Sequence, residues 1–190
     1  MTLDEPIQFY LKNKAQIDEW AALAKKTSIE ADQFFRSIAS DLVAAISDAE
    51  GDPVAYISLG EKEKYPKLFL HREEWRLSAE KVPIVAIGVE WIRASVQFDT
   101  SYRGVWIDKD KDIAKTLKHE LSPLLKESHN GNSRQWLSAP YWPIWQYVIP
   151  SQTDFWVDLE IFRQELIDSI LECWRQDWKV VDEVVTGIKE

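Results

Sequence analysis

Apolar residues recur at helical spacing along the last third of the chain, and the other elements can be placed around this segment. After a polar break at residues 151–153, one apolar face begins near Asp158 and comprises Phe162, Leu166, Ile170, Trp174, Val181, Val185 and Ile188. Such a period marks a helix face that is buried against a neighbour. A helix of about 30 residues spans roughly 45 Å, so the rest of the chain must provide the surface on which it lies.

The N-terminal part, residues 1–50, carries a helical pattern that we divide into two pieces. Ile17, Trp20 and Ala24 share one face of the first piece. Thr27 and Ser28 interrupt the pattern, and Ser28 is of the type that caps a second helix. The second piece has a broad apolar face that includes Phe34, Ile38, Leu42 and Ala45. The turn residues Gly51-Asp52-Pro53 then end the helical part.

The period changes to two between residues 54 and 108, which predicts strands. We expect strands at residues 54–59, 68–71, 82–91, 95–98 and 104–107, and a last one at 145–149. Short strands with short polar connectors and no helix between them favour an antiparallel meander. Gly88, inside the third strand, indicates a bulge or a close approach of two backbones.

A further helix is expected at residues 110–127, before a loop at 129–133. Its inward face should consist of Ile113, Leu117, Leu121 and Leu124. The prediction is therefore an α+β fold, with a central antiparallel β-meander flanked by N-terminal helices and one long C-terminal helix. The length fits a single domain, 1–190, with a helical part (1–50), a sheet with one helix (51–150) and the long helix (151–190).

Charge and tryptophan content bear on the choice of partner. The 190 residues include 10 Trp, and 32 acidic against 23 basic residues give a net charge of −9. Direct nucleic-acid binding is disfavoured, because clustered Lys and Arg supply that affinity. The acidic balance leaves open a mimic of nucleic acid that binds a basic partner. Because Trp is enriched at interface anchors, we expect some of these indoles to meet another protein or a second copy of the chain.

Common catalytic and metal-binding patterns find little support in the sequence. None of the three histidines has a second His or Cys three or four residues away, as a metal site on a helix needs. The single Cys173 is expected to pack as a small hydrophobe. Nucleophile elbows and glycine-rich phosphate loops are missing. We expect no metal and no cofactor, and a cytoplasmic protein without signal peptide or membrane span.

A metal-dependent nuclease is the catalytic alternative. Such an enzyme gathers carboxylates around Mg²⁺ beside a lysine. Asp52 could be the first acid, but in the following run Glu61 and Lys62 have the wrong spacing, and the only Asp-x-Lys is Asp177-Trp178-Lys179 in the long helix. An atypical or degenerate nuclease-related protein that uses Asp52, Glu61 and Lys62 is the second hypothesis.

Three segments mix arginine, carboxylate and tryptophan and hold the candidate binding residues. These residues are Arg72, Glu74, Trp75, Arg76, Trp91, Arg93, Arg103 and Trp106. On one face of the meander they would form an Arg-and-Trp surface suited to protein recognition or base stacking. The alternative is that Arg side chains pack over Trp rings from strand to strand, as part of the structure.

Two aromatic segments carry a family resemblance. They are Ile7-Gln8-Phe9-Tyr10-Leu11 with Ile17 and Trp20, and Trp142-Pro143-Ile144-Trp145-Gln146-Tyr147. Over about half of its length the chain resembles uncharacterised bacterial proteins associated with PD-(D/E)XK nuclease-like chains. The resemblance implies a recognition or scaffolding part, in bacterial defence, counter-defence or mobile elements. Because the nuclease motif is missing here, the first hypothesis is a non-catalytic protein-interaction protein with an accessory or regulatory role.

Overall fold

The computed structural model describes most of the chain as helices and strands around one sheet. It describes residues 3–46, 50–59, 64–77, 81–91, 101–109, 112–129, 136–148 and 158–189. The helices are α1 (Glu5–Lys12), α2 (Lys14–Ala44), α3 (Ala114–Ser128) and α4 (Leu159–Lys189), with a short 3-10 helix, η2 (Glu73–Trp75). The strands are β1 (Val54–Ser58), β2 (Lys67–His71), β3 (Val85–Glu90), β4 (Tyr102–Ile107), β5 (Leu137–Ala139) and β6 (Trp142–Tyr147).

The six strands form one antiparallel sheet in the order β1-β2-β3-β4-β6-β5. Strands that follow one another along the chain lie next to one another, except where α3 and β5 intervene between β4 and β6. This arrangement confirms the predicted α+β class, with N-terminal helices, a central antiparallel meander and one long C-terminal helix.

Two glycines permit the close packing of the central strands. Gly88 of β3 lies opposite Gly104 of β4. A Cβ atom added at Gly88 would lie 2.2 Å from the Leu68 carbonyl oxygen, and one added at Gly104 would lie 2.2 Å from the Ile144 carbonyl oxygen. Gly104 also has a φ of +151°, which side chains disfavour. The close backbone approach predicted at Gly88 is confirmed.

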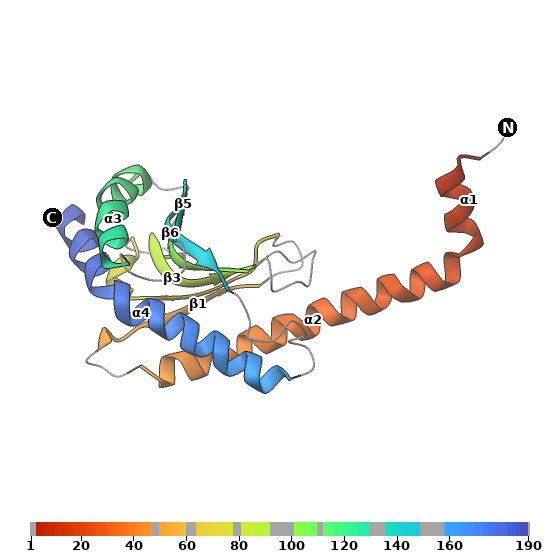
Figure 1. Cartoon of the computed structure of the whole chain (residues 1–190), viewed down its shortest axis with the longest axis horizontal. Coiled ribbons are helices and arrows are strands. Elements are labelled where there is room, and N and C mark those ends of the chain that lie inside the picture. Colours follow the sequence, from red (N-terminus) through yellow and green to blue (C-terminus); the bar gives the residue numbers. More distant parts are fainter. Residues whose placement is uncertain are drawn as a thin grey trace.

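Three helices cover the same face of the sheet (Figure 1). The stripe predicted along α4 is buried there, from Phe162 at 2% exposure through Trp174 at 0% to Val185 at 2%. The second half of α2 lies beside α4, where the rings of Phe34 and Phe162 stack with centroids 5.9 Å apart. α3 lies at one end of this layer and packs against α4 and β6. The core is therefore a helix-on-sheet layer in which apolar side chains of α2, α3 and α4 meet one face of the strands.

The N-terminal helices differ from their prediction. The break lies at Asn13, and α2 runs unbroken through Thr27 and Ser28. Inside the helix the Thr27 hydroxyl donates to the Leu23 carbonyl, four residues earlier, at 3.0 Å, as Thr in a helix commonly does. The helix ends at Ala44, before the predicted stop at 51–53.

Smaller differences concern α3 and the strands. α3 buries Leu117, Leu121 and Leu125, while Leu124, predicted to face inward, is 43% exposed. The buried face of α3 therefore repeats every fourth residue, and Leu125 takes the place that was predicted for Leu124. β5 was not predicted, and the strand expected at 95–98 lies outside the described residues.

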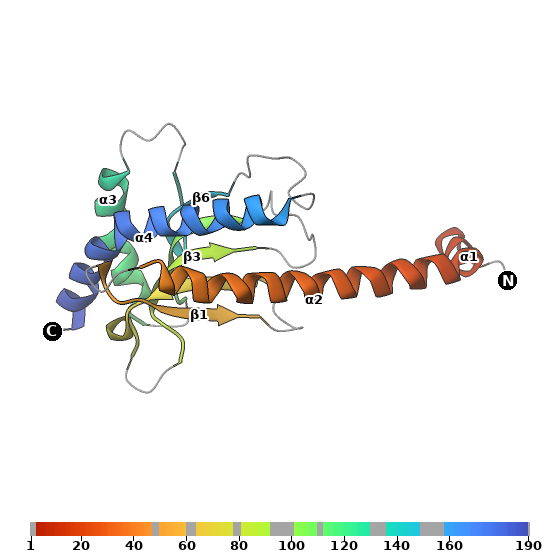
Figure 2. The same ribbon diagram turned by 90° about the horizontal axis from the view of Figure 1, so that it is seen from below.

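A long helical arm extends from the compact part of the molecule (Figures 1 and 2). We call α1 and residues 14–33 of α2 the arm. No residue of α1 is buried, and among the side chains of α2 that the structure describes, the first buried one is Phe35. Among the helices of the described segments, none is long and apolar enough to cross a membrane.

Candidate functional site

The predicted Arg-and-Trp residues do not lie together on one exposed face. Trp75 belongs to η2 and is 0% exposed, with its ring centroid 5.5 Å from that of Trp174. Its indole N–H donates to Asp182 at 2.9 Å. Trp91 follows β3 and stacks on Phe35 at a centroid distance of 3.7 Å. Both indoles are therefore part of the core beneath the helices.

Arg103 and Trp106 lie on opposite faces of β4. They are three residues apart on a strand, and alternate residues of a strand face opposite sides of the sheet. Arg103 faces the helices, where its guanidinium donates to the Ser169 carbonyl and lies 3.0 Å from a Glu172 carboxylate oxygen. Trp106, 8% exposed, stacks on Phe69 on the other face at 5.1 Å. The expectation of one shared Arg-and-Trp face is wrong for these two residues.

The remaining predicted residues form ion pairs around η2. Arg72 donates to Asp182 at 2.6 Å and lies 3.4 Å from Glu74, while Arg76 pairs with Glu73. The Arg72–Asp182 pair links η2 to α4, so its evident role is structural. Arg93 lies outside the described residues, and binding by any member of the set stays a prediction.

The nuclease hypothesis finds one of its three residues in the described structure. Asp52 is exposed in the turn before β1, with a φ of +45°. Glu61 and Lys62 lie outside the described residues, so their distances from Asp52 stay open. Within the described segments, no three His, Cys, Asp or Glu side chains are grouped closely enough to hold a metal ion.

The face of the sheet away from the helices carries an aromatic cavity of about 590 Å³. Phe69, Trp106 and Trp142 are buried in a small cluster there, and the ring of Tyr102 meets that of Trp142 edge-on at 5.0 Å. Polar side chains also line the cavity, among them Lys67, Glu90 and Asp108. Aromatic walls with a few polar groups are typical of small-molecule sites.

Hydrogen bonding and burial limit proton transfer in this cavity. The Tyr102 hydroxyl donates to the Glu90 carboxylate, and Lys67 lies 3.3 Å from that carboxylate. Burial first, and then the hydrogen bond to Glu90, raise the pKa of Tyr102 well above its ordinary value. A phenol with so high a pKa stays protonated at neutral pH and acts as a hydrogen-bond donor. The arrangement suits binding better than acid–base catalysis.

A buried pair joins the end of α3 to α4. His129 Nε2 lies 2.8 Å from an Asp177 carboxylate oxygen, and the two side chains are 1% and 0% exposed. Burial raises the pKa of Asp177 despite the opposing hydrogen bond from His129. His129 directly follows α3, at the start of the expected loop, and is buried together with Asp177 because the end of α3 packs onto α4. Asp177 of the Asp-x-Lys sequence is therefore a core residue. The sequence carried no signal for this pair, because the two residues lie 48 positions apart and each is a single polar residue beside apolar ones.

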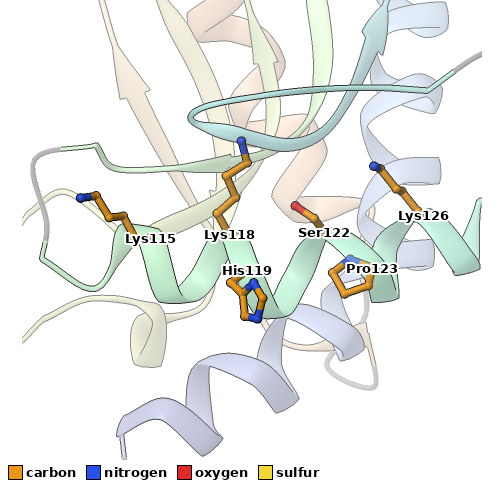
Figure 3. A pocket seen from close by; sticks show the side chains of 6 residues that line it. All are labelled: Lys115, Lys118, His119, Ser122, Pro123 and Lys126. Carbon is orange, nitrogen blue, oxygen red and sulfur yellow. The ribbon is translucent and has the colours of Figure 1, made fainter.

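A shallow basic depression follows one side of α3 (Figure 3). Its volume is about 590 Å³, and its lining consists of Lys115, Lys118, His119, Ser122, Pro123 and Lys126. All six side chains come from one helix, at spacings that place them on one face. Flexible, solvated lysines can attract an anion only weakly, and salt screens that attraction.

The arm exposes seven of the fifteen large apolar side chains that are exposed in the described structure. Those of the arm, at 39–65% exposure, are Ile7, Phe9, Tyr10, Leu11, Trp20, Leu23 and Ile29, and Leu3, just before α1, is 55% exposed. Exposed apolar groups gathered on one element mark sites of interaction with a protein or a membrane. The shared face of Ile17, Trp20 and Ala24 was predicted from the sequence, but periodicity alone does not say what covers that face.

Comparison with known proteins adds no assignment: no family model, curated protein or solved structure matches the chain. The candidate functional surfaces are therefore defined by their geometry, and among them the arm carries the most exposed large apolar side chains.

Proposed function

We propose that this chain is a non-catalytic interaction protein that binds another protein chain through its helical arm. The observation that carries the proposal is the exposure of Trp20 and Leu23, at 61% and 60%, on a helix that extends away from the sheet. In water a short helix without tertiary contacts is marginal. An exposed apolar helix therefore gains most when it packs against a partner.

The kind of side chain supports a protein partner. Tryptophan in the middle of a contact area is the commonest anchor of protein interfaces. Membrane-surface helices instead carry Lys and Arg along their polar face. The arm alternates acidic and basic residues, with Asp18 and Glu19 followed by Lys25 and Lys26. Such a mixed polar face favours a protein surface over an anionic lipid surface.

The proposal is tested with the full-length chain as bait in a lysate of its native host, read by mass spectrometry. The double variant Trp20→Glu/Leu23→Glu should lose the proteins that the parent recovers, copies of the chain itself included. Leu124→Glu is the matched control, because Leu124 is 43% exposed on α3, away from the arm. Equal recovery by the parent and the arm variant would contradict the proposal.

A further inference from the structure

We infer that the aromatic cavity on the sheet face away from the helices binds a small, uncharged heteroaromatic molecule of about the size of a nucleoside. This second site is separate from the arm and does not depend on the function proposed for it. The cavity volume of about 590 Å³ lies within the range of roughly 300–1,000 Å³ that is usual for small-molecule sites. Six of the lining residues are aromatic, namely Tyr56, Tyr65, Tyr102, Trp106, Tyr141 and Trp142.

The side chains on this face differ from those expected where a sheet meets water. The helices α2, α3 and α4 lie on the opposite face (Figure 1). An antiparallel sheet that is covered on one face usually carries polar side chains on the other. Here Phe69 is 0% exposed, Trp142 6% and Trp106 8%, and they form a cluster of their own. Packing of the helices does not require this cluster, whereas a site for an aromatic ligand does.

The arrangement of the rings suits a further aromatic ring. Trp142 meets Phe69 and Tyr102 edge-on, with centroids 5.9 Å and 5.0 Å apart. Trp106 stacks on Phe69 at 5.1 Å. Edge-on and offset-stacked contacts are the two favourable geometries of aromatic pairs. A planar ligand in the cavity extends the cluster through contacts of the same two kinds with Trp106 and Trp142.

The charges of the cavity favour an uncharged ligand. The charged lining residues are two lysines and two carboxylates, Lys67, Lys109, Glu90 and Asp108. Lys67 lies 3.3 Å from Glu90, and their side chains are only 16% and 7% exposed. Glu90 also accepts from the Tyr102 hydroxyl, and Lys67 donates to the Tyr65 carbonyl at 2.8 Å. Because the chain itself balances these charges, an ionic ligand would lose its hydration without gaining a matching counter-charge.

Hydroxyl groups of the lining match the edge of a heteroaromatic ring. Ser58 and Tyr141 both line the cavity, and each hydroxyl can donate and accept a hydrogen bond. A ring with nitrogen and carbonyl groups at its edge offers both kinds of partner. A nucleic-acid strand is disfavoured as the source of this ring, because the net charge of −9 opposes a phosphate backbone. The ligand class is therefore a free heteroaromatic molecule.

Nuclear magnetic resonance of the tryptophan indole N–H groups tests the inference on the purified full chain. The probes are adenosine, uridine and nicotinamide, each in the low millimolar range. The signals of Trp106 and Trp142 are identified by their loss in Trp106→Phe and Trp142→Phe. At least one probe should shift these two signals in a saturable manner and leave those of Trp20, on the arm, and Trp174, beneath the helices, unchanged. No saturable shift with any of the three probes would overturn the inference.

Charged analogues of adenosine test the preference for an uncharged ligand. Adenosine 5′-monophosphate adds negative charge, and 1-methyladenosine is positively charged at pH 7. Each should bind roughly tenfold or more weakly than adenosine, because the cavity does not compensate the added charge. Tighter binding of either analogue would contradict the charge argument. A single-stranded oligonucleotide that shifts the same signals at lower concentrations than the nucleosides would overturn the assignment to a free molecule.

Replacement of a tyrosine at the cavity tests its location without disturbing the core. Tyr141 lines the cavity and is 45% exposed, so Tyr141→Ala should leave the urea unfolding midpoint nearly unchanged. Its affinity for the bound probe should fall about fivefold or more, as expected for the loss of an aromatic contact with a base. Tyr147→Ala is the matched control, because Tyr147 is 48% exposed on β6 and does not line the cavity. Equal affinities of the parent and Tyr141→Ala, or an equal loss in both variants, would overturn the site.

Discussion

Replacement of Trp75 tests whether this tryptophan stabilises the core or belongs to a binding surface. Trp75 is 0% exposed, packs on Trp174 and donates its indole N–H to Asp182. Replacement of a buried Trp by Ala costs about 3–5 kcal/mol of unfolding free energy. We take this range to include the lost hydrogen bond to the Asp182 carboxylate. Typical domains have about 5–15 kcal/mol of unfolding free energy in total. Trp75→Ala should therefore lose a fifth or more of the unfolding free energy.

Urea unfolding followed by far-UV circular dichroism measures this loss. Trp20→Ala is the matched comparison, because Trp20 is 61% exposed and a surface substitution changes the unfolding free energy by about 0.5 kcal/mol or less. Both variants should be measured at equal, low protein concentrations, because any association would add to the apparent stability. A Trp75→Ala variant within about 1 kcal/mol of the parent, at unchanged m-value, would refute the core assignment.

Three further predictions concern other buried positions. Burial raises the pKa of the Cys173 thiol to about 12, so we expect Ellman's reagent to react with the native protein at the rate of its unfolding; fast labelling in buffer would contradict this. Burial also raises the pKa of Asp177 above its ordinary 3.8. The native state then holds that proton more tightly, so Asp177 should cost stability as the pH rises from about 4 through the raised pKa. The unfolding free energy of Asp177→Asn relative to the parent should rise over that interval, and a flat or falling difference would count against the assignment. Gly104→Ala should destabilise the sheet by several kcal/mol in the same urea assay, because its Cβ would lie 2.2 Å from the Ile144 carbonyl oxygen; an unchanged midpoint would argue against that close approach.

Helix faces could be predicted where a single spacing continues without interruption. The α4 stripe from Phe162 to Val185 is buried as expected, because an apolar face of that length has few ways to avoid water. On α3 the sequence offered Leu124 and Leu125 at adjacent positions. Which of the two is buried depends on how α3 is rotated about its own axis relative to α4, and the spacing of apolar residues does not determine this rotation.

The candidate site was harder to predict, because it depends on which surfaces remain uncovered. Arg and Trp adjacent in sequence suggested a surface, yet Arg103 and Trp106 face opposite sides of the sheet. The His129–Asp177 pair joins residues 48 positions apart, for which local periodicity holds no information. The arm was visible only as a helical pattern, because amphipathicity reveals an apolar face and not its partner.

The central claim, that the arm is a surface on which another protein chain binds, is tested most directly by affinity capture from a lysate of the native host, with the full chain beside Trp20→Asp and mass spectrometry as the readout. We predict that the parent recovers at least one protein, further copies of the chain included, and that a Trp20→Asp variant of unchanged helicity does not, because Trp20 is 61% exposed on the arm. Equal recovery by the parent and by Trp20→Asp would contradict the claim.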